Sequence, residues 1–260
     1  MIKLNGTIVE RNKFPDGTLL MKADTESRIN TIEWRYESDS ELFAVYCLKR
    51  HLDELCINPQ TKLIMYYIPN ARQDRVKNEE DVFTLKHFSE IINSLQFDTV
   101  EVLDPHSSVS EALINNLVLK NPSVYIQEAY AECDPDILFY PDEGSMKRYS
   151  ECYPVEYAFG IKKRDWSTGK IQRLELMNKE LVKGSNVLIV DDICSRGGTF
   201  YHSAKALKEA GANKIYLYIT HCENTILEGE VLMSGLIEKV YTTNSIFTKE
   251  HEKIEVFDIC

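Results

Sequence analysis

The sequence predicts an α/β protein in which two domains follow one another, each with a mostly parallel central sheet flanked by helices. Short apolar runs of strand length alternate with amphipathic stretches of helical length, which is typical of such sheets. The alternation restarts after Asn121-Pro122, so we expect domains over 1–120 and 121–260. With 260 residues, 43% of them hydrophobic, each half is long enough to bury a core.

The first half predicts short strands and then alternating helices and strands. Residues 1–23 alternate loosely and contain the turn signals Asn5-Gly6 and Pro15-Asp16-Gly17. Apolar side chains then recur at helical spacing from Ser40 onward, and apolar runs of strand length separate the later helical segments. We expect helices over 40–55, 80–95 and 108–119, and strands over 63–68 and 99–103.

The second half repeats this alternation. The run Val187 to Val190 predicts a buried strand, and Gly211 predicts the end of the helix that follows it. The stretch 162–170 is polar and has no apolar periodicity, so we expect a mobile loop there. We expect strands over 136–140, 155–161, 187–190 and 214–220, and a helix over 199–210.

Composition excludes several functional classes. The chain has 41 acidic and 30 basic residues, and a net charge of −11 opposes general binding to nucleic acids. Its seven cysteines form no C-x-x-C pair, which indicates reduced thiols. No apolar leader is present, and no window approaches the ~18 apolar residues of a membrane span. We therefore expect a cytoplasmic protein without nucleic-acid or membrane partners.

The strongest motif is VLIVDDICSRGGT, residues 187–199. Asp191 and Asp192 follow an apolar strand, where paired carboxylates can hold the vicinal hydroxyls of a ribose. Gly197 and Gly198 allow backbone N–H groups to converge on a phosphate, and Thr199 begins a helix whose N-terminus adds positive potential. Ligands of open α/β sheets bind at this end of the strands. The alternative is an ordinary strand-to-helix turn whose acids cap the helix.

This motif resembles the phosphoribosyl-pyrophosphate loop shared by phosphoribosyltransferases and ribose-phosphate pyrophosphokinases, the PRPP synthetases. Further segments, in the same order along the chain, are similar to the synthetases and not to the transferases. They are Phe14-Pro15-Asp16-Gly17, Pro69-Asn70-Ala71-Arg72-Gln73-Asp74-Arg75, Asp104-Pro105-His106-Ser107, Pro141-Asp142-x-Gly144-x-x-Lys147-Arg148, Lys162-Lys163-Arg164, Thr220-His221 and Thr243-Asn244-Ser245-Ile246.

The resemblance implies two tandem phosphoribosyltransferase-like domains and a Mg²⁺-dependent transfer of pyrophosphate from ATP to a phosphorylated ribose. It also implies a homodimer or a larger homo-oligomer, because adenine contacts in that family cross subunits. The residue roles that it implies are ribose hydroxyls for Asp191 and Asp192, the 5-phosphate for Ser195, Arg196, Gly197, Gly198 and Thr199, ATP for Phe14, Asp16, Arg72, Gln73, Asp74 and His106, Mg²⁺ for His106 and Asp142, and catalysis for Lys162, Arg164 and His106.

Each smaller segment also has a plain structural interpretation. Arg72 can grip a phosphate with two hydrogen bonds, but Arg72-Gln73-Asp74 alone could be a solvated turn. A lone His106 is more often a structural histidine, and Asp142 could merely shape a turn, although Mg²⁺ prefers oxygen ligands. The basic run that begins at Lys162 is, without context, a solvated surface.

The chain departs from the family pattern at several positions. Thr18 stands where the family has Glu, Cys222 where it has Gly, and Ser195-Arg196 where it has Asp-Thr. The last change raises the local charge by two units and favours additional negative charge near the 5-position, as in ADP-ribose. Alternatively, Arg196 grips the same 5-phosphate or points to solvent.

The reaction that these residues imply is transfer of the β,γ-pyrophosphoryl group of ATP to the C1 hydroxyl of ribose 5-phosphate, giving PRPP and AMP. Three alternatives remain open. The acceptor is ADP-ribose and the product serves NAD salvage; the protein is a phosphoribosyltransferase; or it is a catalytically silent relative that regulates a true synthetase.

Overall fold

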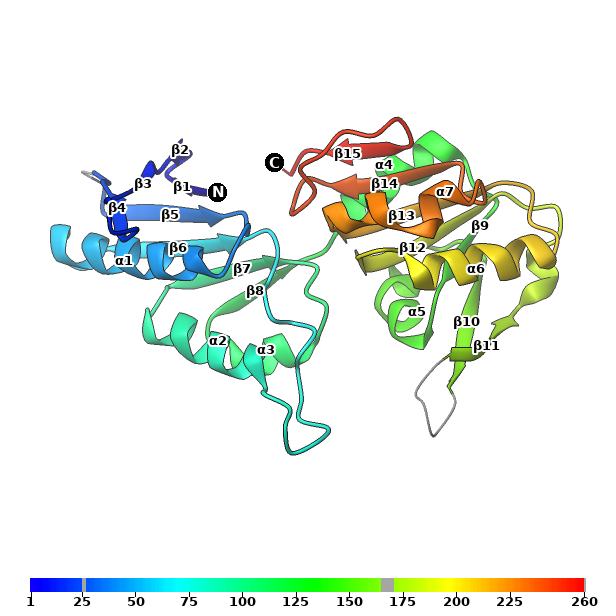
Figure 1. Cartoon of the computed structure of the whole chain (residues 1–260), viewed down its shortest axis with the longest axis horizontal. Helices are drawn as coiled ribbons and strands as arrows, with labels where there is room; N and C mark the ends of the chain where they lie inside the picture. The colour runs from blue at the N-terminus through cyan, green and yellow to red at the C-terminus, as the bar shows by residue number, and fades with distance from the viewer. Residues whose placement is uncertain (25–26, 165–170, 260) are drawn as a thin grey trace. The chain divides into compact units, whose positions relative to one another are not determined.

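The computed structural model describes residues 1–24, 27–164 and 171–259, and the chain divides into two compact units (Figure 1). Unit 1 covers Met1–Asn121 and unit 2 covers Pro122–Cys260. Each unit is built on its own sheet, in which most neighbouring strands run parallel. The prediction of an α/β chain with two mostly parallel sheets is confirmed. Among the described residues, no helix is long and apolar enough to cross a membrane.

Unit 1 contains a six-stranded sheet with the strand order β2-β1-β5-β6-β7-β8. The strands from β5 to β8 are parallel, whereas β1 is antiparallel to both β2 and β5. Its elements are β1 (Ile2–Leu4), β2 (Thr7–Ile8), β5 (Ile29–Trp34), α1 (Ser40–Leu55), β6 (Gln60–Met65), α2 (Thr84–Ser94), β7 (Thr99–Leu103), α3 (Val109–Leu113) and β8 (Leu117–Lys120).

The core of unit 1 lies on one face of this sheet. Apolar residues alternate with polar ones along its strands, so Ile32 and Trp34 of β5 are buried with Leu63 and Met65 of β6. The buried faces of α1 and α2 belong to the same hydrophobic cluster. The other face carries charged pairs such as Lys62 with Glu101. The sequence around 29–34 gives only a weak strand signal because Ile29 is exposed and Asn30 is buried, which breaks the apolar alternation at the start of β5.

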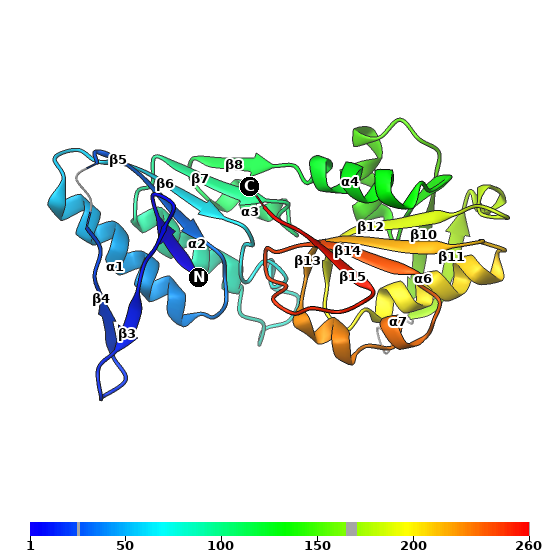
Figure 2. The ribbon, with the colours of Figure 1, turned by 90° about the horizontal axis from the view of Figure 1, so that it is seen from above.

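A separate two-stranded hairpin of β3 (Arg11–Lys13) and β4 (Leu19–Met21) extends past α1 in Figure 2. Its turn is stabilised by the Asp16 carboxylate, which accepts hydrogen bonds from the backbone N–H of Thr18 at 2.9 Å and from its hydroxyl at 2.7 Å. Phe14 at the turn is 49% exposed. The hairpin therefore holds an aromatic side chain in solvent.

Unit 2 contains a seven-stranded sheet with the order β11-β10-β9-β12-β13-β14-β15, parallel except at β11. All four residues from Val187 to Val190 are buried, as expected for a central parallel strand covered on both faces. Its elements are α4 (Ser123–Cys133), β9 (Ile137–Tyr140), α5 (Glu143–Tyr149), η1 (Ser150–Cys152), β10 (Tyr157–Arg164), β11 (Ile171–Met177), η2 (Lys179–Leu181), β12 (Val187–Cys194), α6 (Gly198–Glu209), β13 (Ile215–Cys222), η3 (Asn224–Glu228), α7 (Glu230–Met233), β14 (Lys239–Thr243) and β15 (Ile254–Phe257).

Two of the expected elements differ in kind from the structure. The helix expected over 108–119 is wrong, because α3 ends at Leu113 and β8 begins at Leu117. Asn116 between them adopts φ 55°, a left-handed conformation that ends a helix, and β8 then pairs with β7. In the stretch expected to be a loop over 162–170, residues 162–164 belong to β10, and residues 165–170 lie outside the described residues.

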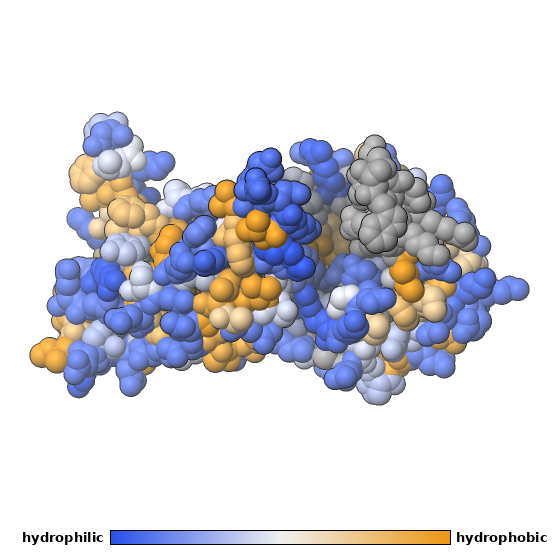
Figure 3. Space-filling model, turned by 90° about the horizontal axis from the view of Figure 1, so that it is seen from below, coloured by the Kyte–Doolittle hydropathy of each residue, from blue (hydrophilic) through white to orange (hydrophobic). Residues whose placement is uncertain are grey.

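Figure 3 shows one face of the molecule, on which hydrophobic residues form small, separate patches among hydrophilic ones. The exposed hydrophobic side chains come from several elements, including Phe43 on α1 and Met233 on α7. Scattered apolar side chains of this kind are normal on a protein surface and do not by themselves mark an interface.

Candidate functional site

The acid pair of the strongest motif lies in the second half of β12, before the chain enters α6. Asp192 is 4% exposed, and Nη1 of Arg148 on α5 lies 2.6 Å from its Oδ2. The backbone N–H of Asp192 donates to Oδ1 of Asp191 at 3.0 Å, so the two carboxylates are held in a fixed relation. Arg148 therefore supplies positive charge to a buried acid that solvent cannot stabilise. The sequence motifs contain Arg148 but gave no indication of this pairing.

The loop after these acids is shaped by Gly197. Its φ of 75° lies in the left-handed region, and a Cβ there would be 2.4 Å from Cγ1 of Val231. Gly198 begins α6, a helix of 12 residues, and the N–H of Tyr201 donates to the carbonyl of Gly197 at 2.9 Å. The backbone of residues 195–199, called the phosphate loop below, thus leads directly into a helix N-terminus, where N–H groups attract anions.

Arg196 in the phosphate loop forms an ion pair with Glu228 at the end of η3. Nη2 of Arg196 is 3.2 Å from Oε2 of Glu228, and the two side chains are 72% and 64% exposed. Gly229 packs against the loop so closely that a Cβ there would lie 1.9 Å from the carbonyl oxygen of Arg196. The charge that Arg196 adds to the loop therefore has a carboxylate beside it.

Cys194 and Cys222 are paired neighbours on β12 and β13, and both are buried. A hydrogen bond with Cys222 and burial raise the pKa of the Cys194 thiol far above its usual value. The Cys194 thiol is therefore protonated at neutral pH, and it packs against Gly197 of the phosphate loop. His221 precedes Cys222 on β13, and Nδ1 of its buried ring lies 2.9 Å from Oγ of Ser245.

Asp142 lies at the N-terminus of α5 and caps it. Its Oδ1 accepts hydrogen bonds from the backbone N–H groups of Gly144 at 3.0 Å and Ser145 at 3.1 Å, which completes a capping box. A carboxylate at a helix cap keeps oxygen lone pairs that can face a cation, so the cap does not exclude a role beside Mg²⁺.

In unit 1, two loops at the carboxyl ends of β6 and β7 are joined through Asp74 (the nucleotide loops, 70–75 and 104–107). The hydroxyl of Ser107 donates to Oδ2 of Asp74 at 2.7 Å. Arg75 donates to the same carboxylate twice, from Nε at 2.7 Å and from Nη2 at 2.9 Å. The hydrogen bond from Arg75, ahead of that from Ser107, lowers the pKa of Asp74 from 3.8 to about 2. Asp74 therefore remains ionised throughout the neutral range.

The other predicted residues of unit 1 lie around this connection. Arg72 is exposed and His106 is half-buried, so both reach the surface of the nucleotide loops. Gln73 is oriented by Thr84, whose hydroxyl donates to its Oε1 at 3.1 Å. Ser107, which ends the segment Asp104-Pro105-His106-Ser107 and was assigned no role, is buried and connects the second loop to Asp74.

Two of the predicted catalytic residues are described only in part. Lys162 and Arg164 belong to strand β10, and their side chains lie outside the described residues. The hairpin residues Phe14 and Asp16 lie apart from the nucleotide loops in sequence, on their own ribbon. Hydrogen bonds from Thr18 lower the pKa of Asp16, so Thr18 stabilises the turn at the position where the related family carries Glu.

Within the described residues, no three His, Cys, Asp or Glu side chains are grouped so that they could hold a metal ion. His106 and Asp142, the two predicted Mg²⁺ contacts, belong to different units. Mg²⁺ that is bound together with a nucleotide commonly takes most of its ligands from phosphates and water, with only one or two carboxylates from the protein.

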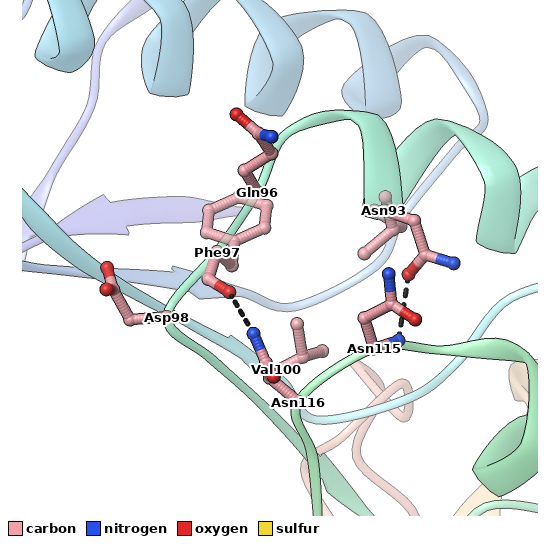
Figure 4. Close-up of a pocket in the computed structure, with 8 residues that line it drawn as sticks. Asn93, Gln96, Phe97, Asp98, Val100, Asn115 and Asn116 are labelled. Atoms are coloured by element: carbon pink, nitrogen blue, oxygen red, sulfur yellow. Dashed lines mark hydrogen bonds between the residues drawn. The ribbon is translucent and has the colours of Figure 1, made fainter.

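A pocket of about 320 Å³ in unit 1 does not contain any of the predicted site residues (Figure 4). It opens at the start of β7, at the opposite end of the strand from His106. Its polar groups are engaged locally: Nδ2 of Asn116 donates to the carbonyl of Phe97 at 3.0 Å, and Oδ1 of Asn93 accepts from the N–H of Asn115 at 2.9 Å. This pocket is therefore a poor candidate for the nucleotide site.

Comparison with known proteins identifies the family and the fold of this chain. Residues 152–232 match the family model of the phosphoribosyl transferase domain. The ribose-phosphate pyrophosphokinase of Pyrococcus abyssi is 30% identical over 264 residues, which cover 96% of this chain and 88% of that relative. The corresponding protein of Sulfurisphaera tokodaii is 26% identical, again over 96% of this chain and 88% of its own length.

A solved structure has the same fold. The phosphoribosylpyrophosphate synthetase from Mycobacterium smegmatis superimposes with a TM-score of 0.77 at 18% identity, covering 96% of this chain and 86% of that one. This likeness confirms the predicted fold class of two phosphoribosyltransferase-like domains with mostly parallel sheets.

Proposed function

Because the chain belongs to the ribose-phosphate pyrophosphokinase family, we propose that it transfers the β,γ-pyrophosphoryl group of ATP to the C1 hydroxyl of ribose 5-phosphate. The hydroxyl oxygen attacks the β-phosphorus, the bond from that phosphorus to the α,β-bridging oxygen breaks, and AMP leaves. The hydroxyl proton is released to solvent, and the products are PRPP and AMP.

The observation that carries this proposal is the end of β12, where two acids precede a glycine-shaped loop at a helix N-terminus. Asp191 and Asp192 accept hydrogen bonds from the ribose hydroxyls, and Arg148 keeps Asp192 charged and oriented. The N–H groups of the phosphate loop bind the 5-phosphate. These contacts hold the acceptor so that its anomeric hydroxyl is directed toward the nucleotide.

The nucleotide loops of unit 1 bind ATP in this proposal. Arg72 grips phosphate oxygens, Gln73 hydrogen-bonds the nucleotide, and His106 contacts the phosphates or the ion that they hold. Asp74 positions the two loops relative to each other by accepting a hydrogen bond from Ser107. Phe14 and Asp16 of the hairpin contribute the adenine contact.

Mg²⁺, held by the nucleotide phosphates beside His106 and Asp142, would neutralise charge on the transferring group. Lys162 and Arg164 add positive charge to the same group as the bond to AMP breaks. Phosphoryl transfer depends mainly on alignment and on charge stabilisation, so these cations carry most of the catalytic effect of the chain's own residues.

The test is to incubate the purified protein with ATP, Mg²⁺ and ribose 5-phosphate, and to identify the products by mass. AMP and PRPP appearing together in equal amounts support the proposal. AMP without a pyrophosphorylated sugar indicates hydrolysis and contradicts it. No AMP with any phosphorylated ribose would favour the silent relative, and consumption of PRPP with a base would favour a phosphoribosyltransferase.

Substitution of the basic residues on β10 tests their catalytic role. We expect Lys162→Ala and Arg164→Ala each to lower kcat by about 100-fold or more, the scale for loss of charge stabilisation in the transition state, while ATP still binds. Lys163→Ala is the matched control, because it removes the same charge from the same segment and has no assigned role. Equal rates in all three variants would exclude Lys162 and Arg164 from catalysis.

Arg196 favours a second candidate function, the same transfer with ADP-ribose as acceptor. Ribose 5-phosphate ends at one phosphate, whereas ADP-ribose carries a second phosphate beyond it. The exposed guanidinium of Arg196 lies on the phosphate loop, where it could contact that second group. Turnover with ADP-ribose and none with ribose 5-phosphate would reassign the acceptor and keep the mechanism.

We also propose that the chain assembles into a homodimer or a larger homo-oligomer in the cytoplasm. The support is the hairpin of unit 1, whose Phe14 is half-exposed and available to a second copy. Light scattering on the intact protein measures the assembly, and Phe14→Ala is expected to weaken ATP binding.

A further inference from the structure

The last residue of η3 and the three residues after it pack against the outside of the phosphate loop and are called the wall below. This wall, residues 228–231, packs against the loop at two points, through the backbone of Gly229 and through the side chain of Val231. A Cβ on Gly229 would lie 1.9 Å from the carbonyl oxygen of Arg196, and a Cβ on Gly197 would lie 2.4 Å from Cγ1 of Val231. At both points only a glycine leaves room for the neighbouring atoms, so the wall and the loop are closely packed there.

Glu228 begins this wall and directs its carboxylate to Arg196. Nη2 of Arg196 is 3.2 Å from Oε2 of Glu228, a charge-assisted hydrogen bond between two exposed side chains. The adjacent Gly229 packs against the backbone carbonyl of Arg196, and this contact keeps the Glu228 backbone close to Arg196. The negative charge of Glu228 therefore stays beside the phosphate loop when an acceptor enters.

This placement has a direct electrostatic consequence. The charge of Arg196 is balanced by Glu228, so the pair adds no net charge to the loop. An acceptor that uses Arg196 must displace Glu228, and its phosphate then lies near a carboxylate of the same sign. Both effects are modest, because an exposed ion pair alters an equilibrium by no more than about fivefold. They are nevertheless large enough to alter a preference between two acceptors.

We propose that Glu228 is a specificity-determining residue: by holding Arg196, it disfavours acceptors that carry a second phosphate beyond the 5-phosphate. The 5-phosphate itself binds to the N–H groups of residues 197–199 and depends less on this pair. The inference rests on the proposed function, since it concerns the acceptor of the same site, and it acts through Arg196 without contact with the reacting atoms.

The test compares kcat/KM for ADP-ribose and for ribose 5-phosphate in Glu228→Gln. The ratio of the two is expected to rise by about three- to fivefold, the range that an exposed ion pair allows, with the change in KM and not in kcat. Glu230→Gln is the matched control, because it removes the same charge two residues away, from a side chain that is also exposed. Its ratio is expected to equal that of the wild type.

A second variant shows whether the effect passes through Arg196. In an Arg196→Gln background, Glu228→Gln is expected to leave the ratio unchanged, because the partner that it releases is gone. An unchanged ratio in the single variant, or the same increase in both backgrounds, overturns the proposal. An equal increase in Glu230→Gln also overturns it, because the effect would then come from general charge.

These outcomes remain separable from those of the proposed function. If the wild type releases AMP with neither acceptor, the proposed function fails. The inference is then tested by calorimetric titration of the same variants with ribose 5-phosphate and ADP-ribose. The ratio of the two dissociation constants is expected to shift by the same factor in Glu228→Gln, and no shift overturns the inference by itself.

Discussion

The ion pair between Arg148 and Asp192 makes a strong prediction about stability. The variant is Arg148→Met, which keeps much of the aliphatic side chain and removes the guanidinium. Asp192 is 4% exposed, so its charge cannot be solvated in place, and the distance of 2.6 Å allows a strong interaction. Removing one partner of a buried ion pair costs about 3–5 kcal/mol. Arg148 is 31% exposed, so solvent screens part of the interaction. We therefore expect the free energy of unfolding to fall by somewhat less than this range, about 2–3 kcal/mol.

The assay is equilibrium unfolding in urea, followed by circular dichroism at pH 7. For a unit of this size the dependence on urea is about 1–3 kcal/mol per molar, so the transition of unit 2 is expected to shift by roughly 1 M. Lys147→Met is the control. Lys147 lies beside Arg148 on α5 and pairs with Glu143 at 3.7 Å, but these side chains are 72% and 58% exposed. Its loss is expected to cost less than about 0.5 kcal/mol.

Equal unfolding transitions for the two variants would refute the reasoning. They would mean that the buried carboxylate of Asp192 gains no more from Arg148 than a surface residue gains from its neighbour. A second measurement connects the pair to function: Arg148→Met is expected to raise the KM of the acceptor more than that of ATP, because Asp192 is assigned to the ribose hydroxyls. Equal changes in both would leave Arg148 with a structural role alone.

Two further predictions concern loop geometry and acid stability. Gly229→Ala places a Cβ 1.9 Å from the Arg196 carbonyl oxygen, so it is expected to lower the free energy of unfolding by about 1–3 kcal/mol and to weaken acceptor binding. Gly198→Ala is the control: its Cβ meets nothing within 4 Å, and it is expected to unfold like the wild type. Asp74, with its pKa lowered from 3.8 to about 2, stabilises the fold at and above pH 4, and this stability is lost as the pH falls toward 2. The free energy of unfolding, measured as a function of pH, is therefore expected to be lower in Asp74→Asn than in the wild type by up to about 2 kcal/mol at pH 7, and equal in the two near pH 2. A difference that does not change with pH would contradict the role of Arg75.

The sequence was sufficient for the elements whose signals are local. Helix α1 and strand β7 have the predicted bounds, because a complete apolar face marks the helix and turn residues border the strand. Strand β5 and helix α4 were not predicted. In β5, the apolar Ile29 is exposed and the polar Asn30 is buried, so the first half of the strand lacks the alternation that would have indicated it. The exchange from helix to strand after Asn116 depended on a left-handed residue that periodicity does not reveal.

The candidate site shows the same division between local and distant information. The acid pair and the glycines of 191–199 are adjacent in sequence, so a motif could find them. Their partners come from other elements: Arg148 is 44 residues from Asp192, Ser107 is 33 residues from Asp74, and Glu228 is 32 residues from Arg196. Such contacts arise because parallel strands bring loops from distant segments to one edge of a sheet. No spacing rule in a single sequence predicts them.

The distant partner also changes how the substitution in the phosphate loop should be interpreted. From the sequence, Ser195-Arg196 in place of Asp-Thr adds two units of positive charge. With Glu228 at 3.2 Å from Arg196, the charges of Ser195, Arg196 and Glu228 sum to zero, whereas Asp-Thr beside the same carboxylate would sum to −2. A gain of that size does not select an acceptor by total charge, because ribose 5-phosphate and ADP-ribose carry similar charge on their phosphates. Selection then depends on where the second phosphate lies relative to the Arg196–Glu228 pair, which is a question of geometry that substitutions at both positions can answer.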